Sequence, residues 1–551
     1  MSERRSAPRE VRQAASLLLL RDGEHGLEVL MLRRAERDGD IRSGAVVFPG
    51  GVLDARDRDA HGHVLGPSDE EASARLGVDA GGLDYYVAAL RESFEEVGLL
   101  LAAPALPSAR FATLLPWRAR LQSGSASMAE FCRAEQLRLD AGALTAYSHW
   151  LTPPGVAQRF DTRFFAALAP AGQEAVADRG EAVELMWLTP RAALEPAREL
   201  RLLPVTRRTL QDLSRFGRAD DAYGEARQRR DIPLVMPRRV ASPRGTLRVV
   251  MPDELAYAEV ARLDPEGRGD ITADLAPGRP VRLGANIVRV TAPNAGPMTG
   301  PGTNSYLVGD GRTWTAIDPG PAMPEHVQAL LDAAAPGRIA RILVTHTHRD
   351  HSPAARLLAE ATGAPVYGRR TAHPEWQDES FQPERELADG ERLELAPGVT
   401  LRVLHTPGHA SNHLCYLLEE EKLLFTGDHV MQGSTVVINP PDGDMAAYLR
   451  ALEALLAVDL EWFAPGHGFL VARPHDVLRA LIAHRLRREA KVADALRAAG
   501  TASIDQMLPI VYDDAPEALY PVARRSLLAH LHKLAAEGRV EEQSGRWAWR
   551  G

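Results

Sequence analysis

Residues 345–351 read THTHRDH, which places three histidines and one aspartate within six consecutive positions. The preceding run ARILVT (340–345) is apolar and β-prone, so His346 is expected at the C-terminal end of a buried strand. His348 projects beside it two residues later. Asp350 and His351 then turn back toward the same point before SPAARLLAEA (352–361) begins a helix. Four side chains able to bind a metal are thus expected together.

Three later segments repeat this pattern of a strand followed by a turn with one such side chain. TLRVLHTPGH (400–409) ends in His409, KLLFTGD (422–428) in Asp428, and EWFAPGH (461–467) in His467. Two of the turns are Pro-Gly, which lets the backbone approach closely and presents the next side chain inward. A lone H-x-H is commonly an ordinary pair of surface or core histidines; the full ordered set at strand ends favours one shared site.

Imidazole and carboxylate without thiolate suit Zn²⁺, and also iron or manganese. Seven ligands are too many for one tetrahedral ion. Shared between two ions, they leave positions for a bridging water or hydroxide, the arrangement of a two-metal hydrolase. The candidate ligands are His346, His348, Asp350, His351, His409, Asp428 and His467.

This order of motifs resembles the metallo-β-lactamase superfamily over residues 281–475. PNAGPMTGPGTNSYLVG (293–309), HTPGHASNHLCYLLEEEKLLFTGDHVM (405–431) and the tail segment LLAHLHKLAAEGRV (527–540) resemble its beta-lactamase-like protein 2 branch. That branch carries a winged-helix-like extension and contains metal-dependent endoribonucleases. Thr347 stands where the branch commonly has an aromatic residue.

The resemblance implies an αββα sandwich with two zinc ions. One ion would be held by His346, His348 and His409. The other would be held by Asp350, His351 and His467, with Asp428 bridging the two. Asp350 would also be catalytic, because it can orient or deprotonate the attacking water while serving as a ligand.

A second motif, RESFEEVGL (91–99), lies in the N-terminal half. On a helix, Glu92, Glu95 and Glu96 stand at i, i+3 and i+4 and share one face. Oxygen-only ligation of that kind suits Mg²⁺ or Mn²⁺ bridging a diphosphate. A bare E-x-x-E-E is also an ordinary solvated helix face. The upstream FPGGVLD (48–54) and the helix-stopping Gly98 favour the metal site.

Together these segments resemble the Nudix box, with Gly51 as its first glycine. Asp57 occupies the first glutamate position, and residues 58–90 separate it from Arg91 where the family has seven residues. The subgroup resembled includes CoA diphosphatases. It implies an α/β/α sandwich with the metal bridging Glu92 and Glu96, and with Glu95 as a further ligand or catalytic base. The helix is expected at about 84–97, whether the site is active or only a scaffold.

The predicted fold class is therefore α/β multidomain. We expect a Nudix-like domain at 1–235 and a linker or edge extension at 236–280. A metallo-β-lactamase domain follows at 281–475, and a helical winged-helix-like domain at 484–551.

Composition limits the partners. The chain has 551 residues and a formal charge of −9, which gives no overall attraction to nucleic acid or anionic membrane. With two cysteines in 551 residues we expect no disulfide framework, so a reducing cytoplasm is expected. ASLLLLRDG (15–23) is too short in apolar residues for a membrane span and is expected to be a strand.

Function is expected to be metal-dependent hydrolysis, with RNA or another phosphodiester as the first choice of substrate and Nudix-type diphosphate hydrolysis in the first domain. Thioester or lactone hydrolysis of a small molecule, with an inactive Nudix scaffold, is the alternative. A third reading is a regulatory protein that binds nucleic acid through its C-terminal domain. Residues 485–551 contain 11 Lys/Arg and nine Asp/Glu, a balance too even for a basic patch. The oligomeric state stays open.

Overall fold

The computed structural model describes residues 11–36, 43–178, 180, 182–242 and 246–550. The chain forms two compact units. The first contains residues 1–240, 246–252 and 266–269, and the second contains the remainder. Residues 1–10, assigned to the first domain from the sequence, lie outside the described part.

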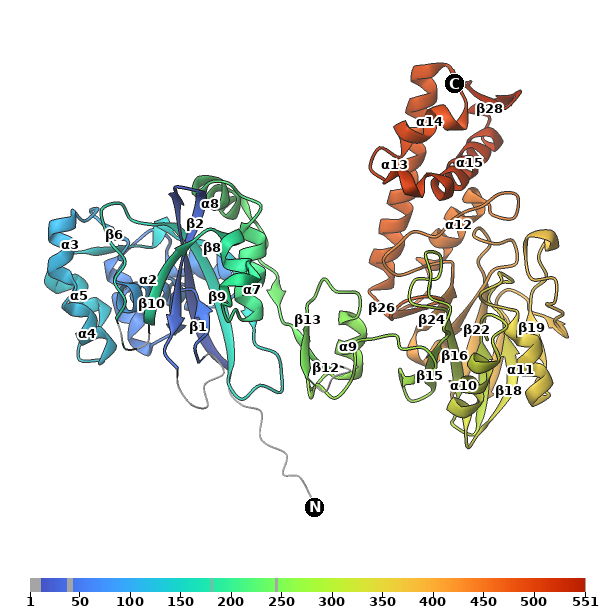
Figure 1. Cartoon of the computed structure of the whole chain (residues 1–551), viewed down its shortest axis with the longest axis horizontal. Helices are drawn as coiled ribbons and strands as arrows, with labels where there is room; N and C mark the ends of the chain where they lie inside the picture. Colours follow the sequence, from blue (N-terminus) through green and yellow to red (C-terminus); the bar gives the residue numbers. More distant parts are fainter. Residues whose placement is uncertain (1–10, 37–42, 179, 181, 243–245, 551) are drawn as a thin grey trace. The chain divides into compact units, whose positions relative to one another are not determined.

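The first unit is built on a mixed sheet with helices on both faces (Figure 1). In spatial order its strands are β10 (Ala182–Leu188), β2 (Gly26–Arg34), β1 (Val11–Gly23), β9 (Arg159–Leu168), β8 (Thr145–Leu151) and β11 (Leu234–Val235), with β3 (Val46–Val47) on β2 and β4 (Gly50–Val52) on β1. Leu17 and Leu19 pack into one core, and Leu18 and Leu20 into the other. The apolar run at the start of the chain is therefore a strand buried on both sides, as expected.

Helices of the first unit divide between these two cores. One core contains α1 (Asp69–Leu76), α2 (Gly82–Val97), α3 (Ser108–Leu114), α4 (Trp117–Gln122) and α5 (Met128–Glu135). The other contains α6 (Pro190–Leu194), α7 (Pro204–Leu213) and α8 (Ala219–Gln228).

The long insertion at 58–90 is folded. The 3-10 helix η1 (Ala55–His63), strand β5 (Val64–Leu65) and α1 occupy it, and α2 begins within it. Strand β5 pairs with β7 (Arg138–Asp140), which also pairs with β6 (Ala102–Ala103). The insertion thus forms part of the core around α2.

The segment expected as a linker or edge extension contains regular structure. Strands β12 (Arg238–Ala241) and β13 (Leu247–Val250) form a two-stranded sheet. Helix α9 (Tyr257–Leu263) belongs to the second unit, where Glu259 forms a buried ion pair with Arg289.

Two sheets with a shared core form the body of the second unit. The first contains, in order, β14 (Pro280–Arg282), β15 (Ile287–Thr291), β16 (Asn304–Gly309), β17 (Thr313–Ile317), β18 (Arg338–Leu343), β19 (Val366–Gly368) and β20 (Arg385–Glu386). The second contains β21 (Arg392–Ala396), β22 (Val399–His405), β23 (Leu414–Leu418), β24 (Leu423–Gly427), β25 (Trp462–Pro465) and β26 (Val471–Ala472). Apolar side chains from both sheets fill the space between them.

Helices cover the outer faces of these sheets. Helices α10 (Pro324–Ala334) and α11 (Ala354–Thr362) pack on the first sheet, and α12 (Met445–Leu455) and the start of α13 (Pro474–Ala499) on the second (Figure 1). Helix–sheet–sheet–helix layering results, with the strand ends that carry the candidate ligands reaching one edge.

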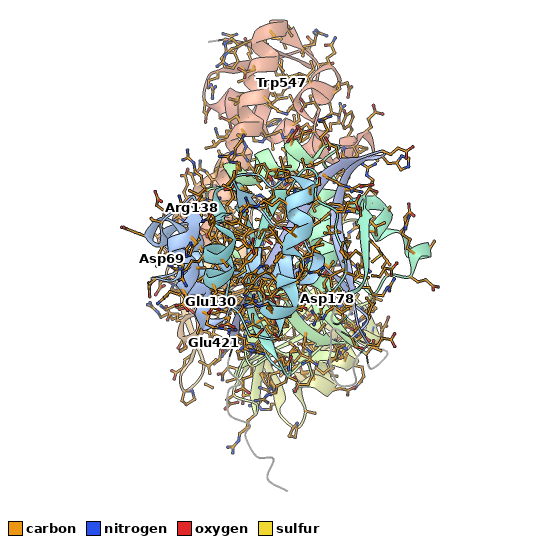
Figure 2. The ribbon with its side chains drawn as sticks, turned by 90° about the vertical axis from the view of Figure 1, so that its left-hand side faces the viewer. Asp69, Glu130, Arg138, Asp178, Glu421 and Trp547 are labelled. Atoms are coloured by element: carbon orange, nitrogen blue, oxygen red, sulfur yellow. The ribbon has the colours of Figure 1, made fainter. Side chains whose placement is uncertain are left out.

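A helical segment ends the chain. Helix α13 spans residues 475–484, between the two domains expected from the sequence, without a break. It is followed by β27 (Thr501–Ala502), α14 (Ile504–Val511), α15 (Tyr520–Ala536), β28 (Val540–Gln543) and β29 (Arg546–Trp549). Ser503 caps α14, and β28 and β29 form a hairpin. Trp547, labelled in Figure 2, is only 3% exposed and packs in the core of this segment.

Cys132 and Cys415 are both buried free thiols. Within the described ranges, no helix is both long and apolar enough to cross a membrane.

Candidate functional site

The four strand ends predicted from the sequence meet at one place in the second unit. His346 follows β18, His409 follows β22, Asp428 follows β24 and His467 follows β25. Two glycines permit the approach. A Cβ at Gly408 would lie 2.4 Å from the Cα of Tyr448, and one at Gly466 would lie 2.8 Å from Oδ1 of Asp428. The Pro-Gly turns are therefore required by space at this edge.

Seven side chains form two adjacent clusters. His346, His348 and His409 form the first, and Asp350, His351, Asp428 and His467 the second. In each cluster the potential ligand atoms lie within 4.8 Å of one another. The structure thus brings together all seven residues predicted for this half.

In the first cluster three ring nitrogens converge. Nε2 of His346 and Nε2 of His409 each lie 2.9 Å from Nδ1 of His348. The Nδ1–H of His409 donates to the carbonyl of Val437 at 2.7 Å, so its Nε2 carries a lone pair. His346 is oriented in the same way. The Thr345 hydroxyl donates its proton to Asp318, so it accepts the Nδ1–H of His346 at 3.0 Å. A single proton on Nδ1 of His348 can serve only one of these two contacts well, whereas a cation between the rings would accept all three nitrogens.

Asp428 connects the two clusters. Its Oδ1 lies 3.4 Å from Nε2 of His351 and 3.4 Å from Nε2 of His467. Its Oδ2 lies 3.7 Å from Nε2 of His409 in the first cluster. One oxygen therefore faces each cluster, as a bridging carboxylate requires.

The second cluster contains Asp350 at its more open side. Oδ2 of Asp350 lies 3.4 Å from Nε2 of His351 and 3.3 Å from Nε2 of His467. The Asp350 side chain is 27% exposed, whereas those of the two histidines are at most 3% exposed. Of these residues, Asp350 is the one that a water or substrate reaches most easily.

Asp318, which the sequence analysis did not select, orients His351. Its Oδ2 accepts the Nδ1–H of His351 at 2.9 Å and the hydroxyl of Thr345 at 2.7 Å. Its Oδ1 accepts the backbone N–H of Thr345 at 2.7 Å. Carboxylates behind a histidine in this way fix its tautomer and strengthen it as a ligand. The segment IDPG (317–320) ends a strand with an acid before Pro-Gly, a signal like those of the other motifs.

Two further histidines were also missed. His413 stacks on His346 with ring centroids 4.9 Å apart, and His429 follows Asp428 directly. Burial lowers the pKa of both, to about 3 for His429, so both rings are neutral. They form the wall behind the first cluster.

Electrostatics gives His348 and Asp428 the protonation states that metal ligands need, whereas His467 holds a proton that a metal ion would displace. Burial and the surrounding imidazoles lower the pKa of His348 to about 3. Burial opposes ionisation of Asp428, but His467 and His351 outweigh it and hold the Asp428 pKa well below its usual range. Burial likewise lowers the pKa of His467, but Asp428 outweighs it and raises that pKa to about 9. The negative charge of the second cluster thus attracts a positive charge.

The donor set fits metal ions. Nε2 of His351, Nε2 of His467 and Oδ1 of Asp428 are buried without a hydrogen-bond partner. Buried polar atoms are nearly always satisfied, so three such atoms close to one another indicate a bound ion or water at this point. Nitrogen and carboxylate oxygen donors match a transition metal such as zinc.

Comparisons with known proteins agree with this geometry. The family model described as "Metallo-beta-lactamase superfamily" matches residues 298–467. A protein of Aspergillus chevalieri named "Atrochrysone carboxyl ACP thioesterase" is 33% identical over 285 residues, which cover 49% of this chain and 87% of that protein. This chain belongs to the metallo-beta-lactamase superfamily.

Other parts of this metallo-beta-lactamase superfamily protein match further families. The "NUDT19 Nudix domain" model matches residues 79–208, and the "Beta-lactamase associated winged helix domain" model matches residues 503–547. The "Beta-lactamase-like protein 2 homolog" of Drosophila melanogaster is 31% identical over 274 residues, covering 47% of this chain and 91% of that protein. The predicted multidomain α/β fold class, with Nudix, metallo-β-lactamase and winged-helix domains, is confirmed.

Among solved structures, a Nudix hydrolase from Alicyclobacillus acidocaldarius is 28% identical, with a TM-score of 0.33. The match covers 40% of this chain and 97% of that one.

In the Nudix unit, the three predicted glutamates lie on α2 but their carboxylates have different partners. Oε2 of Glu96 accepts the backbone N–H of Gly50 at 2.8 Å, and Glu96 also faces Arg34 at 3.7 Å. Glu92 accepts from Arg91 at 2.7 Å, and Glu95 lies 3.6 Å from Arg91. In the part of the chain that the structure describes, they do not form a cluster as tight as those of the second unit. Their role in metal binding stays a prediction.

Asp57 reaches Arg91 in spite of the long insertion. Arg91 donates Nε–H to Oδ1 of Asp57 at 2.8 Å and Nη2–H to its Oδ2 at 3.2 Å. The residue at the first glutamate position of the box therefore does contact the arginine of the motif. Burial raises the pKa of Glu95 to about 7, although Arg91 opposes this, so Glu95 can exchange a proton near neutral pH.

Proposed function

We propose that this chain is a two-metal hydrolase that cleaves an acyl thioester in its second unit, with diphosphate hydrolysis in its first unit. The observation that carries the proposal is Asp428, whose two oxygens face two separate clusters of ligands. One side chain placed in this way is what a pair of ions a few ångströms apart requires.

In this proposal, His346, His348 and His409 hold one zinc ion, and Asp350, His351 and His467 the other, with Asp428 between them. Bound metal ions supply Lewis-acid activation of water and of the electrophilic centre. The carboxylate of Asp350, on the more open side, accepts the proton of the attacking water and orients it. Asp318 keeps His351 in place during the reaction.

Thioesters are favoured by a relative. The protein of Aspergillus chevalieri that shares 33% identity with this chain bears the name of an acyl-carrier thioesterase, and the match covers 87% of it. A thioester is an activated carbonyl, which a two-metal site can attack without stabilising a poor leaving group.

RNA cleavage is the second candidate, and the winged-helix match at residues 503–547 is the observation in its favour. The charges of the C-terminal segment 485–551, which contains this match, weigh against it. Seven of its basic side chains are paired with acids: Arg488 with Asp514, Lys491 with Asp513, Arg497 with Asp494, Arg524 with Asp505, Lys533 and Arg539 with Glu489, and Arg550 with Glu541. Nucleic-acid binding depends on basic side chains that neutralise phosphates.

The start of this C-terminal segment, called the tail below, instead contacts the loop beside the first cluster. Arg485 of α13 donates to the carbonyl of Val436, and the carbonyl of the next residue, Val437, accepts from His409. The tail therefore supports the loop that orients a metal ligand.

For the first unit, we propose Mg²⁺ or Mn²⁺ held by Glu92 and Glu96, with Glu95 as a further ligand or base. Oxygen donors suit these ions. The match to a Nudix domain model and the Asp57–Arg91 contact support this. The substrate we propose is a diphosphate such as a CoA ester.

The test is a direct comparison of substrates. Full-length protein with Zn²⁺ is assayed for thiol release from an acyl-CoA and for cleavage of single-stranded RNA, as wild type and as Asp428→Asn. We expect thiol release that the substitution lowers at least 100-fold. RNA cleavage sensitive to the substitution, without thiol release, would replace the thioester by the second candidate.

A further inference from the structure

A cavity of about 390 Å³ lies in the first unit, on the sheet face that carries Trp150 and Phe164. Phe160, Thr162 and Phe164 alternate along β9 and all line it, together with Phe48 and Val52. A volume of this size is typical of small-molecule sites. None of the functions derived above uses this space.

The cavity offers little for polar recognition. The Ser16 hydroxyl donates to the carbonyl of Pro49 at 2.9 Å, and Oγ1 of Thr152 accepts the N–H of Phe160 at 3.1 Å. Arg239 donates to the carbonyl of Gly155 at 2.5 Å. These three polar groups are thus occupied by the protein, and most of the other lining side chains are apolar, so a base or sugar would leave most of its own polar atoms unsatisfied. An aliphatic chain has no such atoms to satisfy.

One end of the cavity meets the Nudix glutamates. Gly50 and Gly51 line it, and the N–H of Gly50 donates to Glu96. A Cβ at Gly51 would lie 2.2 Å from Oε1 of Glu92. Arg34, which also lines the cavity, faces Glu96 at 3.7 Å. A molecule with its anionic group at the glutamates therefore has an apolar space directly beside it.

We propose that this cavity binds the aliphatic chain of an anionic substrate whose diphosphate lies at Glu92 and Glu96. The proposal rests on the diphosphate hydrolysis proposed for the first unit and names the part of the substrate that this unit selects. Each methylene buried in the cavity is worth about a fourfold gain in affinity until the space is filled.

Binding of alkyl diphosphates to the full-length protein provides the test. In these compounds the chain is joined directly to the diphosphate, so it can enter the space beside the glutamates, and they contain no thioester that the second unit could cleave. Titration calorimetry with the butyl, octyl and dodecyl compounds should show affinity that rises at least 100-fold along the series. In Thr162→Phe, which places a ring in the cavity, the rise should be lost while the butyl compound binds as to wild type.

Two more variants complete the design. Ala14→Leu fills the same space from β1, since Ala14 pairs with Thr162 and lines the cavity, and covers the case in which Thr162→Phe does not fold. Thr113→Phe adds the same ring on the exposed side of α3 and should keep the chain-length dependence. Affinity independent of chain length, or a dependence unchanged in both cavity variants, would overturn the proposal.

Diphosphate cleavage, followed with Mg²⁺ on the same compounds, separates this inference from the proposed function. If no compound is cleaved but chain-dependent binding is lost in Thr162→Phe, the Nudix activity is refuted and the chain pocket stands. If all compounds are cleaved with equal kcat/KM, the activity stands and the pocket is refuted.

Discussion

Asp318 is not one of the seven candidate metal ligands, but its carboxylate accepts three hydrogen bonds. The donors are the backbone N–H and the hydroxyl of Thr345 and the Nδ1–H of His351. Asp318→Asn places an amide N–H against one of these donors, so His351 loses its orientation. We expect metal affinity and kcat/KM for hydrolysis to fall about 10- to 100-fold, the usual cost of removing such a partner. Competition with a chelator measures the first quantity and steady-state kinetics the second.

The matched control is Asp332→Asn, because Asp332 accepts a side-chain hydrogen bond from Gln328 on the exposed surface of α10. Both quantities should stay at wild-type values in this variant. If Asp318→Asn behaved like the control, the proposed orientation of His351 would be wrong.

His326 predicts a loss of stability in acid. It is 1% exposed, its Nε2 lies 2.8 Å from the Ser305 hydroxyl, and its Nδ1 has no partner. Burial lowers its pKa to about 4 from the usual 6.5 of histidine. Between these values the unfolded chain binds a proton that the folded chain does not, so stability falls as the pH falls from 6.5 to 4, by about 3 kcal/mol in total.

Denaturant unfolding at fixed metal loading, repeated between pH 7 and pH 4, measures this slope. His326→Gln should have a shallower slope than wild type. His373→Gln, which changes a side chain that is 34% exposed, should keep the slope of the wild type. Identical slopes in wild type and His326→Gln would show that the ring is protonated in the folded state.

At the scale of elements, α9 is anchored more firmly than its setting in a Pro/Gly-rich passage indicates. Glu259 accepts two hydrogen bonds from Arg289 at 2.6 and 2.8 Å, and its Oε2 also accepts the N–H of Leu470 at 2.8 Å. Both side chains of the pair are at most 4% exposed. Glu259→Ala leaves a buried guanidinium without its partner, which costs about 3–5 kcal/mol.

Thermal or denaturant unfolding of the second unit measures this cost. Glu360→Ala serves as control, because the Glu360–Arg356 pair is at least 60% exposed on both sides and is worth less than about 1 kcal/mol. A loss of under 1 kcal/mol for Glu259→Ala would mean that α9 does not depend on the pair.

The strand-end ligands could be predicted because each closely follows the end of an apolar strand, and such runs are visible locally. The local sequence could not show the contacts of Asp318 and Asp57, because their partners His351 and Arg91 lie 33 and 34 residues away. For a related reason, the sequence predicts no more than a linker or edge extension at 236–280. Its composition is irregular, and the pairing of Glu259 with Arg289 appears only once the chain is folded.

For the whole molecule, two proposed metal sites in separate units predict two independent activities. Glu96→Gln should abolish diphosphate cleavage and leave thioester hydrolysis intact, while Asp428→Asn should have the opposite effect. Glu70→Gln, at an exposed position of α1, should change neither rate. Loss of both activities in one of the two site variants would show that the units depend on each other. Equal diphosphate cleavage by wild type and Glu96→Gln would reduce the Nudix fold to a scaffold.

The central claim is a pair of transition-metal ions joined by Asp428, and the metal content of the purified full-length protein tests it most directly. Elemental analysis by mass spectrometry should find about two such ions per chain, most of them zinc. Asp428→Asn should retain at most one ion, while Asp459→Asn, at a side chain 76% exposed, should retain both. A wild-type protein that holds no tightly bound transition metal, or an Asp428→Asn variant that keeps both ions, would contradict the account.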